Sequence, residues 1–283
     1  MRTIPVSAVH RYAVATAIAT FCLLIAGSLV TSTESGLAVP DWPLSYGLWF
    51  PPMVGGILYE HGHRLIAAVV GIMILILAVW LWKVEPRRWV RQLGYGALAA
   101  LILQALLGGL TVLWLLPPQI SIVHACLGQA VFCLVVCLAW CTSVRGAEPL
   151  RTLDDRRATI VRRLALSVAA LAGLQLLLGA VIRHTGHAVF SHMGGALGLL
   201  ALTGWLAGCS LMFRRQAPVV WWAVWRLMGL VGIQTVVGLL VFTNRGSVML
   251  RTAHVAIGAL LLAQAIVLAW EIVRTGTMSL EAR

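Results

Sequence analysis

The hydrophobic and polar positions of this chain separate into long apolar runs joined by short polar segments. Eight runs extend over at least about 18 residues, which is enough for an α-helix to cross roughly 30 Å of hydrocarbon. They lie at about 12–31, 61–82, 92–115, 121–142, 162–182, 189–212, 219–243 and 250–272. The pattern therefore predicts an all-α integral membrane protein with eight transmembrane helices.

The composition agrees with this pattern and excludes a soluble globular domain. Of the 283 residues, 60% are hydrophobic and only 11% are charged. The first apolar run is too long for the core of a signal peptide and no small-residue cleavage site follows it, so we expect a retained helix. All six cysteines fall inside apolar runs, so we expect no disulfide.

The basic residues predict the orientation of the chain in the membrane. The net charge is +12, and a cytoplasmic N-terminus followed by eight spans places 17 of the 21 lysines and arginines on the cytoplasmic side. This asymmetry follows the positive-inside rule, and it makes both termini cytoplasmic. The basic excess therefore indicates anionic membrane lipid, and not nucleic acid, as a partner. Four arginines remain on the outer side: Arg64, Arg183, Arg245 and Arg251.

Rare polar residues recur at nearly constant offsets. A glutamine followed four residues later by a glycine occurs in LQALLGGL (103–110), LQLLLGAV (174–181) and IQTVVGLL (233–240). His124 and His254 are 130 residues apart, and His63 and His192 are 129 apart. These offsets predict two repeated four-helix bundles related by an axis along the membrane normal. The expected organisation is an N-terminal half at 1–143, a cytoplasmic linker at 144–163 and a C-terminal half at 164–283.

Four histidines lie at matched depth near the outer ends of alternate helices. Ionisable groups inside membrane spans are costly, so each one is a functional hypothesis. His63 and His124 are 61 residues apart, and His192 and His254 are 62 apart. Two imidazoles that face each other in a bundle core can bind a haem iron from both sides, so two bis-histidine haem sites are the leading interpretation. Hydrogen-bonded packing histidines are the alternative, and a zinc site fits less well because no cysteine or carboxylate cluster lies nearby.

One acidic residue accompanies the first histidine pair. Glu60 precedes His63 by three residues, so the two share a helix face, whereas the second half has Ala188 or Val189 at that depth. A carboxylate in one half alone suggests chemistry there and electron transfer in the other half. A salt bridge from Glu60 to Arg64 is the alternative, and the two roles are compatible. His61 is two residues from His63 and therefore faces another side of the helix.

The outer arginines are candidates for binding the propionates of a haem, because guanidinium groups pair well with carboxylates. Snorkelling of these side chains to lipid headgroups is the alternative. The candidates are Arg64, Arg183, Arg245 and Arg251.

Together these motifs resemble the heme A synthase family. The resemblance rests on SGLAVPDWPLSYG (35–47), EHGHR (60–64), the repeated glutamine–glycine helices and the four spaced histidines. It implies eight helices in two halves and oxidation of the C8 methyl group of heme O to a formyl group, by successive hydroxylations, to give heme A. It also implies that His63 and His124 hold the substrate haem, that His192 and His254 hold a heme b, and that Glu60 is the essential glutamate.

The resemblance further implies a multi-pass protein of the cell inner membrane with its haem sites toward the outer face. Expected partners are heme O synthase, the assembly of a terminal oxidase, a quinone or other electron acceptor, and a second copy in a homo-oligomer. Two features depart from the family pattern. Val39 and Ser45 stand where many members have a cysteine pair, and the outer loop of the second half is short.

Two other functions remain open at this point. A di-haem b-type electron-transfer protein fits the four histidines, although their common depth argues against a relay across the membrane. A haem carrier or assembly factor without chemistry would make Glu60 replaceable.

Overall fold

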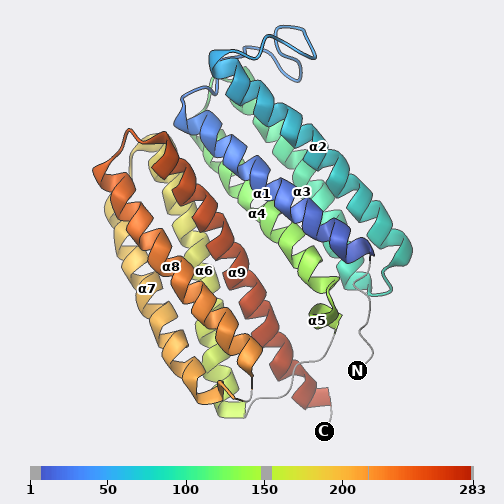
Figure 1. The fold of residues 1–283 in the computed structure, drawn as a ribbon, viewed down its shortest axis with the longest axis vertical. Helices are drawn as coiled ribbons and strands as arrows, with labels where there is room; N and C mark the ends of the chain where they lie inside the picture. Colours follow the sequence, from blue (N-terminus) through green and yellow to red (C-terminus); the bar gives the residue numbers. More distant parts are fainter. Residues whose placement is uncertain (1–7, 148–154, 216, 282–283) are drawn as a thin grey trace. The chain divides into compact units, whose positions relative to one another are not determined.

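The computed structural model describes residues 8–147, 155–215 and 217–281, and these fold almost entirely into helices (Figure 1). Their only extended pairing is an isolated bridge between Ser45 and Leu48. The helices are α1 (Ala8–Ser32), α2 (Gly55–Val84), α3 (Arg88–Leu113), α4 (Pro118–Cys141), α5 (Val144–Ala147), α6 (Asp155–Thr185), α7 (Val189–Ser210), the 3₁₀ turn η1 (Leu211–Phe213), α8 (Pro218–Thr243) and α9 (Val248–Glu281).

Among the described residues, eight helices are long and apolar enough to span a membrane, which confirms the predicted all-α multi-pass membrane protein. The helices extend beyond the apolar runs from which they were predicted. The second span begins at Gly55, whereas its apolar run begins near residue 61. A helix continues through polar residues at the membrane surface because its hydrogen bonds are internal, so hydropathy marks only its central part. Glu60 and His61 therefore lie inside α2.

The chain forms two compact units, one made of residues 1–147 and 244–256 and the other of residues 148–243 and 257–283. The first residues of α9 thus belong to the first unit, and the rest of that helix belongs to the second. The two-bundle repeat and the domain limits at 1–143, 144–163 and 164–283 stay predictions. Residues 148–154 of the expected linker lie outside the described residues.

The first unit contains a closed four-helix bundle. Helix α1 packs against α2 and α4, and α3 packs against the same two helices, so α2 and α4 face each other across a diagonal. Fully buried apolar side chains fill the half of the bundle farther from the α1–α2 connection, including Ala13, Ile74, Leu77, Leu81 and Val135. Glu60, His61 and His63 lie toward the opposite end of α2, close to where that helix begins.

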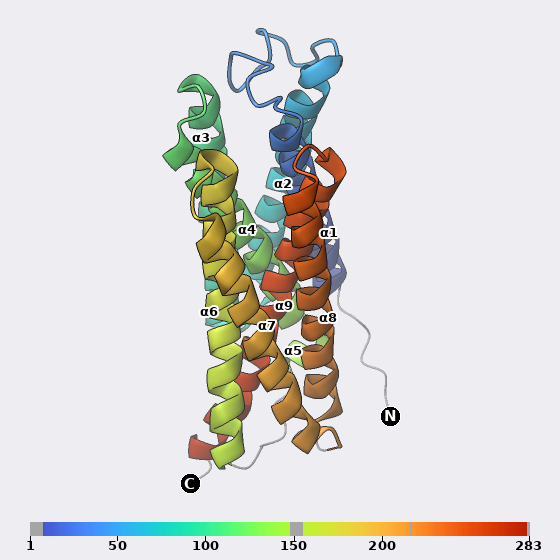
Figure 2. The same cartoon turned by 90° about the vertical axis from the view of Figure 1, so that its left-hand side faces the viewer.

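The segment between α1 and α2 folds over the end of this bundle (Figure 2). The Asp41 carboxylate accepts hydrogen bonds from the backbone N–H groups of Tyr46 and Gly47 at 2.7 and 2.8 Å. These bonds hold the pKa of Asp41 below its usual value, with the Gly47 N–H as the largest cause. The Trp42 ring covers Gly109 of α3, where an added Cβ would lie 2.7 Å from the ring. We call residues 33–54 the outer loop.

In the second unit, α7 packs against both α6 and α8. The Gln234 amide of α8 lies against Gly258 of α9, and Gln264 donates a hydrogen bond to the Ala223 carbonyl at 3.4 Å. These contacts join α8 to the part of α9 that belongs to this unit.

Candidate active site

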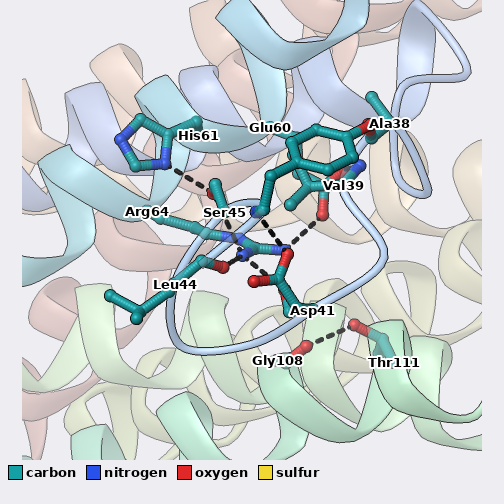
Figure 3. A network of polar contacts seen from close by, with 11 residues as sticks. Ala38, Val39, Asp41, Leu44, Ser45, Glu60, His61, Arg64, Gly108 and Thr111 are labelled. Carbon is teal, nitrogen blue, oxygen red and sulfur yellow. Dashed lines mark hydrogen bonds and ion pairs between the residues drawn. The ribbon is translucent and has the colours of Figure 1, made fainter. Parts of the chain in front are cut away.

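Glu60 lies in the second turn of α2, only 4% exposed, and both of its carboxylate oxygens accept hydrogen bonds (Figure 3). The Arg64 guanidinium donates to Oε1 at 2.6 Å, and the backbone N–H of Val39 donates to Oε2 at 2.9 Å. The salt bridge that the sequence offered as an alternative role is therefore present. A buried carboxylate needs such donors, because an unpaired charge away from water is very unfavourable.

Arg64 connects Glu60 to the outer loop. Its Nη1 donates to the backbone carbonyls of Asp41 and Leu44 at 2.7 and 2.6 Å, while Nη2 holds Glu60. The planar guanidinium suits this task because it presents several donors in fixed directions. These contacts of Arg64 are all within the protein, and its expected role toward a haem propionate remains a prediction.

His63 follows Glu60 by nearly one helical turn and packs against α1. A Cβ added to Gly27 would lie 3.0 Å from Cε1 of His63, so only glycine leaves room for the ring there. Across the diagonal, a Cβ added to Gly108 of α3 would lie 3.0 Å from Cε1 of His124. Each of the two histidines, on α2 and on α4, thus packs against a glycine of a neighbouring helix, α1 or α3.

Gln104 holds His124 from α3. Its amide donates to the His124 carbonyl at 3.0 Å, and the same nitrogen is 3.4 Å from Nε2 of His124. A Cβ added to Gly128, one turn after His124, would lie 3.0 Å from that amide. The glutamine and glycine four residues apart were visible in the sequence. That the glutamine would bond to the histidine helix, and that the glycine would make room for the histidine ring, was not predicted.

Related packing occurs between other helices. The His192 ring on α7 lies 3.5 Å from the Cβ position of Gly179 on α6, and the Gln175 amide contacts the Cβ position of Gly195. The Gln234 amide lies 3.1 Å from the Cβ position of Gly258. Glycine therefore makes space for the polar side chains of these helices, as small residues do in other membrane bundles.

The remaining site candidates lie on or between helices α6 and α9. His192 belongs to the second unit and His254 to the first, so their pairing stays a prediction. Arg251 donates to the carbonyl of Ser32 at 2.7 Å, and this bond ties the start of α9 to the end of α1. Arg183 is half-buried in the last turn of α6, and Arg245 is exposed between α8 and α9. A propionate-binding role for these three arginines also stays a prediction.

The residues around His63 and His124 fit a haem. Nδ1 of His63 is buried and makes no hydrogen bond within the described part of the chain. A neutral imidazole with a free ring nitrogen is a suitable axial ligand for haem iron. The two histidines come from diagonal helices, and the bundle interior between such helices is where cofactor sites are built.

Val39, Ser45 and His61 show what sequence reasoning missed in this network. Val39 contributes only its backbone N–H, for which its side chain gives no signal. The Ser45 hydroxyl and Nδ1 of His61 lie 2.7 Å apart in a buried hydrogen bond, although His61 had been set aside because it faces away from His63. The charged residues at 60 and 64 and the neighbouring His61 were the only available sign of the network.

The comparison with protein families assigns the chain. The family model described as cytochrome oxidase assembly protein (COX15-CtaA) matches residues 55–197, which is half of the chain. The chain belongs to this family. The matched segment of the COX15-CtaA family includes Glu60, His63, His124 and His192, and ends before His254.

Curated relatives carry one name. The chain is 35% identical over 180 residues to a heme A synthase of Lysinibacillus sphaericus. This alignment covers 62% of this chain and 57% of that protein. It is 25% identical over 276 residues to a heme A synthase of Geobacillus kaustophilus, covering 86% and 84%. A third heme A synthase, from Alkalihalophilus pseudofirmus, is 40% identical over 101 residues, which is 34% of each chain. The first alignment thus spans little more than half of that relative.

Proposed function

We propose that this protein is a heme A synthase, which oxidises the C8 methyl group of heme O to a formyl group by successive hydroxylations. Family membership and the name of the curated relatives support the proposal. The structural observation behind it is the buried Glu60, held by Arg64 and Val39 less than one helical turn from His63. Burying an ionisable carboxyl group inside a membrane span is energetically unfavourable, so its presence beside a haem-binding histidine indicates chemistry on the bound haem.

His63 and His124 hold the substrate haem in the first bundle. Gly27 and Gly108 set the position of the two rings, and Gln104 fixes the helix turn that presents His124. The outer loop covers this end of the bundle and excludes water from it, which strengthens every electrostatic interaction inside.

Glu60 acts on the part of the substrate that is oxidised. In its ionised form it stabilises positive charge that develops at the reacting carbon. It also accepts or returns a proton when the ion pair with Arg64 opens. Arg64 orients the carboxylate and keeps one of its oxygens from turning away, since the same guanidinium is anchored on two carbonyls of the outer loop.

His192 and His254 hold a heme b in the C-terminal half. When bound, heme b supplies one-electron transfer. Arg183, Arg245 and Arg251 bind haem propionates at the outer ends of their helices, where a guanidinium suits a carboxylate. A quinone or another electron acceptor is a partner of the protein in this proposal.

The protein lies in the inner membrane with both termini in the cytoplasm and with its haem sites toward the outer face. The distribution of the basic residues and the eight apolar helices support this orientation. Heme O synthase, the assembly of the terminal oxidase and a second copy of the chain are its partners in this proposal.

A comparison of extracted haems tests the function. Wild type and Glu60→Gln are expressed in a host that makes heme O but no heme A, and the haems are separated by chromatography with mass detection. We expect heme A or its hydroxylated precursor with wild type only. If heme O stays unmodified with wild type while heme b is bound, the protein is an electron-transfer or carrier protein.

A further inference from the structure

We propose that Ser45 and His61 are positioning residues for Glu60, because their hydrogen bond fastens the outer loop to α2. This inference rests on the proposed function for its catalytic consequence, but its structural part stands independently. Neither residue touches the Glu60 carboxylate in the contacts described above. They act through the loop segment that holds Arg64.

The hydrogen bond is fully enclosed. The Ser45 side chain has no exposed surface, His61 is 4% exposed, and Oγ lies 2.7 Å from Nδ1. Enclosed polar groups lose their bonds to water on folding, so Nδ1 of His61 depends on the Ser45 hydroxyl for compensation. Nε2 of His61 is buried and makes no hydrogen bond within the described part of the chain, which leaves Ser45 as the polar anchor of the ring.

His61 points to a different side of α2 from Glu60. Adjacent residues of an α-helix are rotated by about 100° around its axis. Glu60 and His61 therefore bind the outer loop from different directions, at Val39 and at Ser45. Figure 3 shows the Ser45 hydroxyl between the His61 ring and the Arg64 guanidinium. The loop is thereby held at Ser45 from one side and at Val39 from the other.

Ser45 is linked to the ion pair through its neighbour. The Leu44 carbonyl, in the preceding peptide, accepts from Nη1 of Arg64 at 2.6 Å, and Oγ of Ser45 is 3.4 Å from the same nitrogen. Reciprocal backbone hydrogen bonds between Ser45 and Leu48, at 3.1 and 3.0 Å, close a tight turn just beyond. When Ser45 is fixed, the Leu44 carbonyl is fixed, and Arg64 then holds Glu60 in one orientation.

Amide hydrogen–deuterium exchange of the full chain in lipid nanodiscs tests the structural part. Ser45→Ala and His61→Leu should accelerate exchange in residues 38–48 by at least about tenfold, the effect of losing one buried hydrogen bond. His61→Asn should restore protection, because its side-chain amide reaches the position of Nδ1. Ser121→Ala is the matched control, since Ser121 is buried in the same unit and its hydroxyl has no hydrogen-bond partner in the described residues.

The same variants test the positioning of Glu60 through the haems that they produce in the host described above. We expect less heme A and more unmodified heme O with Ser45→Ala and His61→Leu, and recovery with His61→Asn. Exchange in residues 131–141 should match wild type, which excludes general unfolding as the cause.

Unchanged exchange of residues 38–48 in both disruptive variants would overturn the inference. Faster exchange with wild-type amounts of heme A would overturn the positioning of Glu60. If wild type makes no heme A, the proposed function fails, whereas the exchange rates still decide whether Ser45 and His61 fasten the loop.

Discussion

Gly27 on α1 and His63 on α2 are in such close contact that a single added carbon at residue 27 would lie 3.0 Å from the imidazole. Gly27→Ala should therefore displace the His63 ring, with a packing cost of about 1–3 kcal/mol. We expect weaker haem binding, measured by titrating the purified protein with haem and following the absorbance of the low-spin complex. Gly96→Ala is the control, because nothing lies within 4 Å of the added carbon at that helical position. Equal haem affinity in the two variants would contradict the placement of the haem at His63.

Gln104 should determine how firmly His124 is held. Gln104→Leu keeps the volume but removes the donor to the His124 carbonyl. Loss of this hydrogen bond should cost about 1 kcal/mol and speed haem release several-fold. The rate is measured by transferring haem to an excess of an apo-globin. Gln92→Leu, at an exposed position of the same helix, should release haem at the wild-type rate. If both variants behave alike, Gln104 has no special relation to the ligand.

Arg64→Lys should reduce heme A formation by at least about tenfold and leave haem binding nearly unchanged. Lysine keeps the charge but cannot contact Glu60 and the carbonyls of Asp41 and Leu44 at the same time. The ratio of heme A to heme O in extracts and the haem content of the purified protein measure the two effects. Arg91→Lys is the control, since Arg91 also donates to a backbone carbonyl, that of Glu85. A parallel loss of bound haem in Arg64→Lys would show that Arg64 serves haem binding and not the orientation of Glu60.

The outer loop should loosen only in acid. The pKa of Asp41 is lowered in the folded protein, first by the Gly47 N–H and then by the Tyr46 N–H and the charge of Arg64. A lowered pKa means that the ionised carboxylate stabilises the loop at pH values above the unfolded pKa of about 3.9, and that this contribution disappears as pH falls through the lower folded pKa. Proteolysis of the loop by an acid-active protease should therefore increase below about pH 4.

Asp41→Asn isolates this effect, because asparagine cannot ionise. The variant loop should be cleaved faster than wild type at pH 5, and the difference should shrink as wild-type Asp41 becomes protonated. A constant ratio of cleavage rates between pH 5 and pH 3 would contradict the role of the Asp41 carboxylate.

The number and kind of the membrane-spanning helices could be predicted from the sequence, because burial in hydrocarbon is a property of each segment by itself. A run of about 20 apolar residues must satisfy its backbone hydrogen bonds internally, whatever its neighbours are. The ends of the helices were harder to predict. Residues 55–59 extend α2 before its apolar run, and nothing in a hydropathy pattern distinguishes them from a loop.

The sequence by itself determined that Glu60, His63 and Arg64 share one end of a membrane helix, since spacing along a helix sets the face and depth of each residue. Only the tertiary structure decided what those residues contact. Val39 reaches Glu60 through a backbone N–H, Ser45 reaches His61 across 16 residues, and Gly27 receives the ring of His63 from another helix. Such contacts depend on the path of an irregular loop and on the packing of one helix against the next. Both are collective properties of the folded chain, which no single segment encodes.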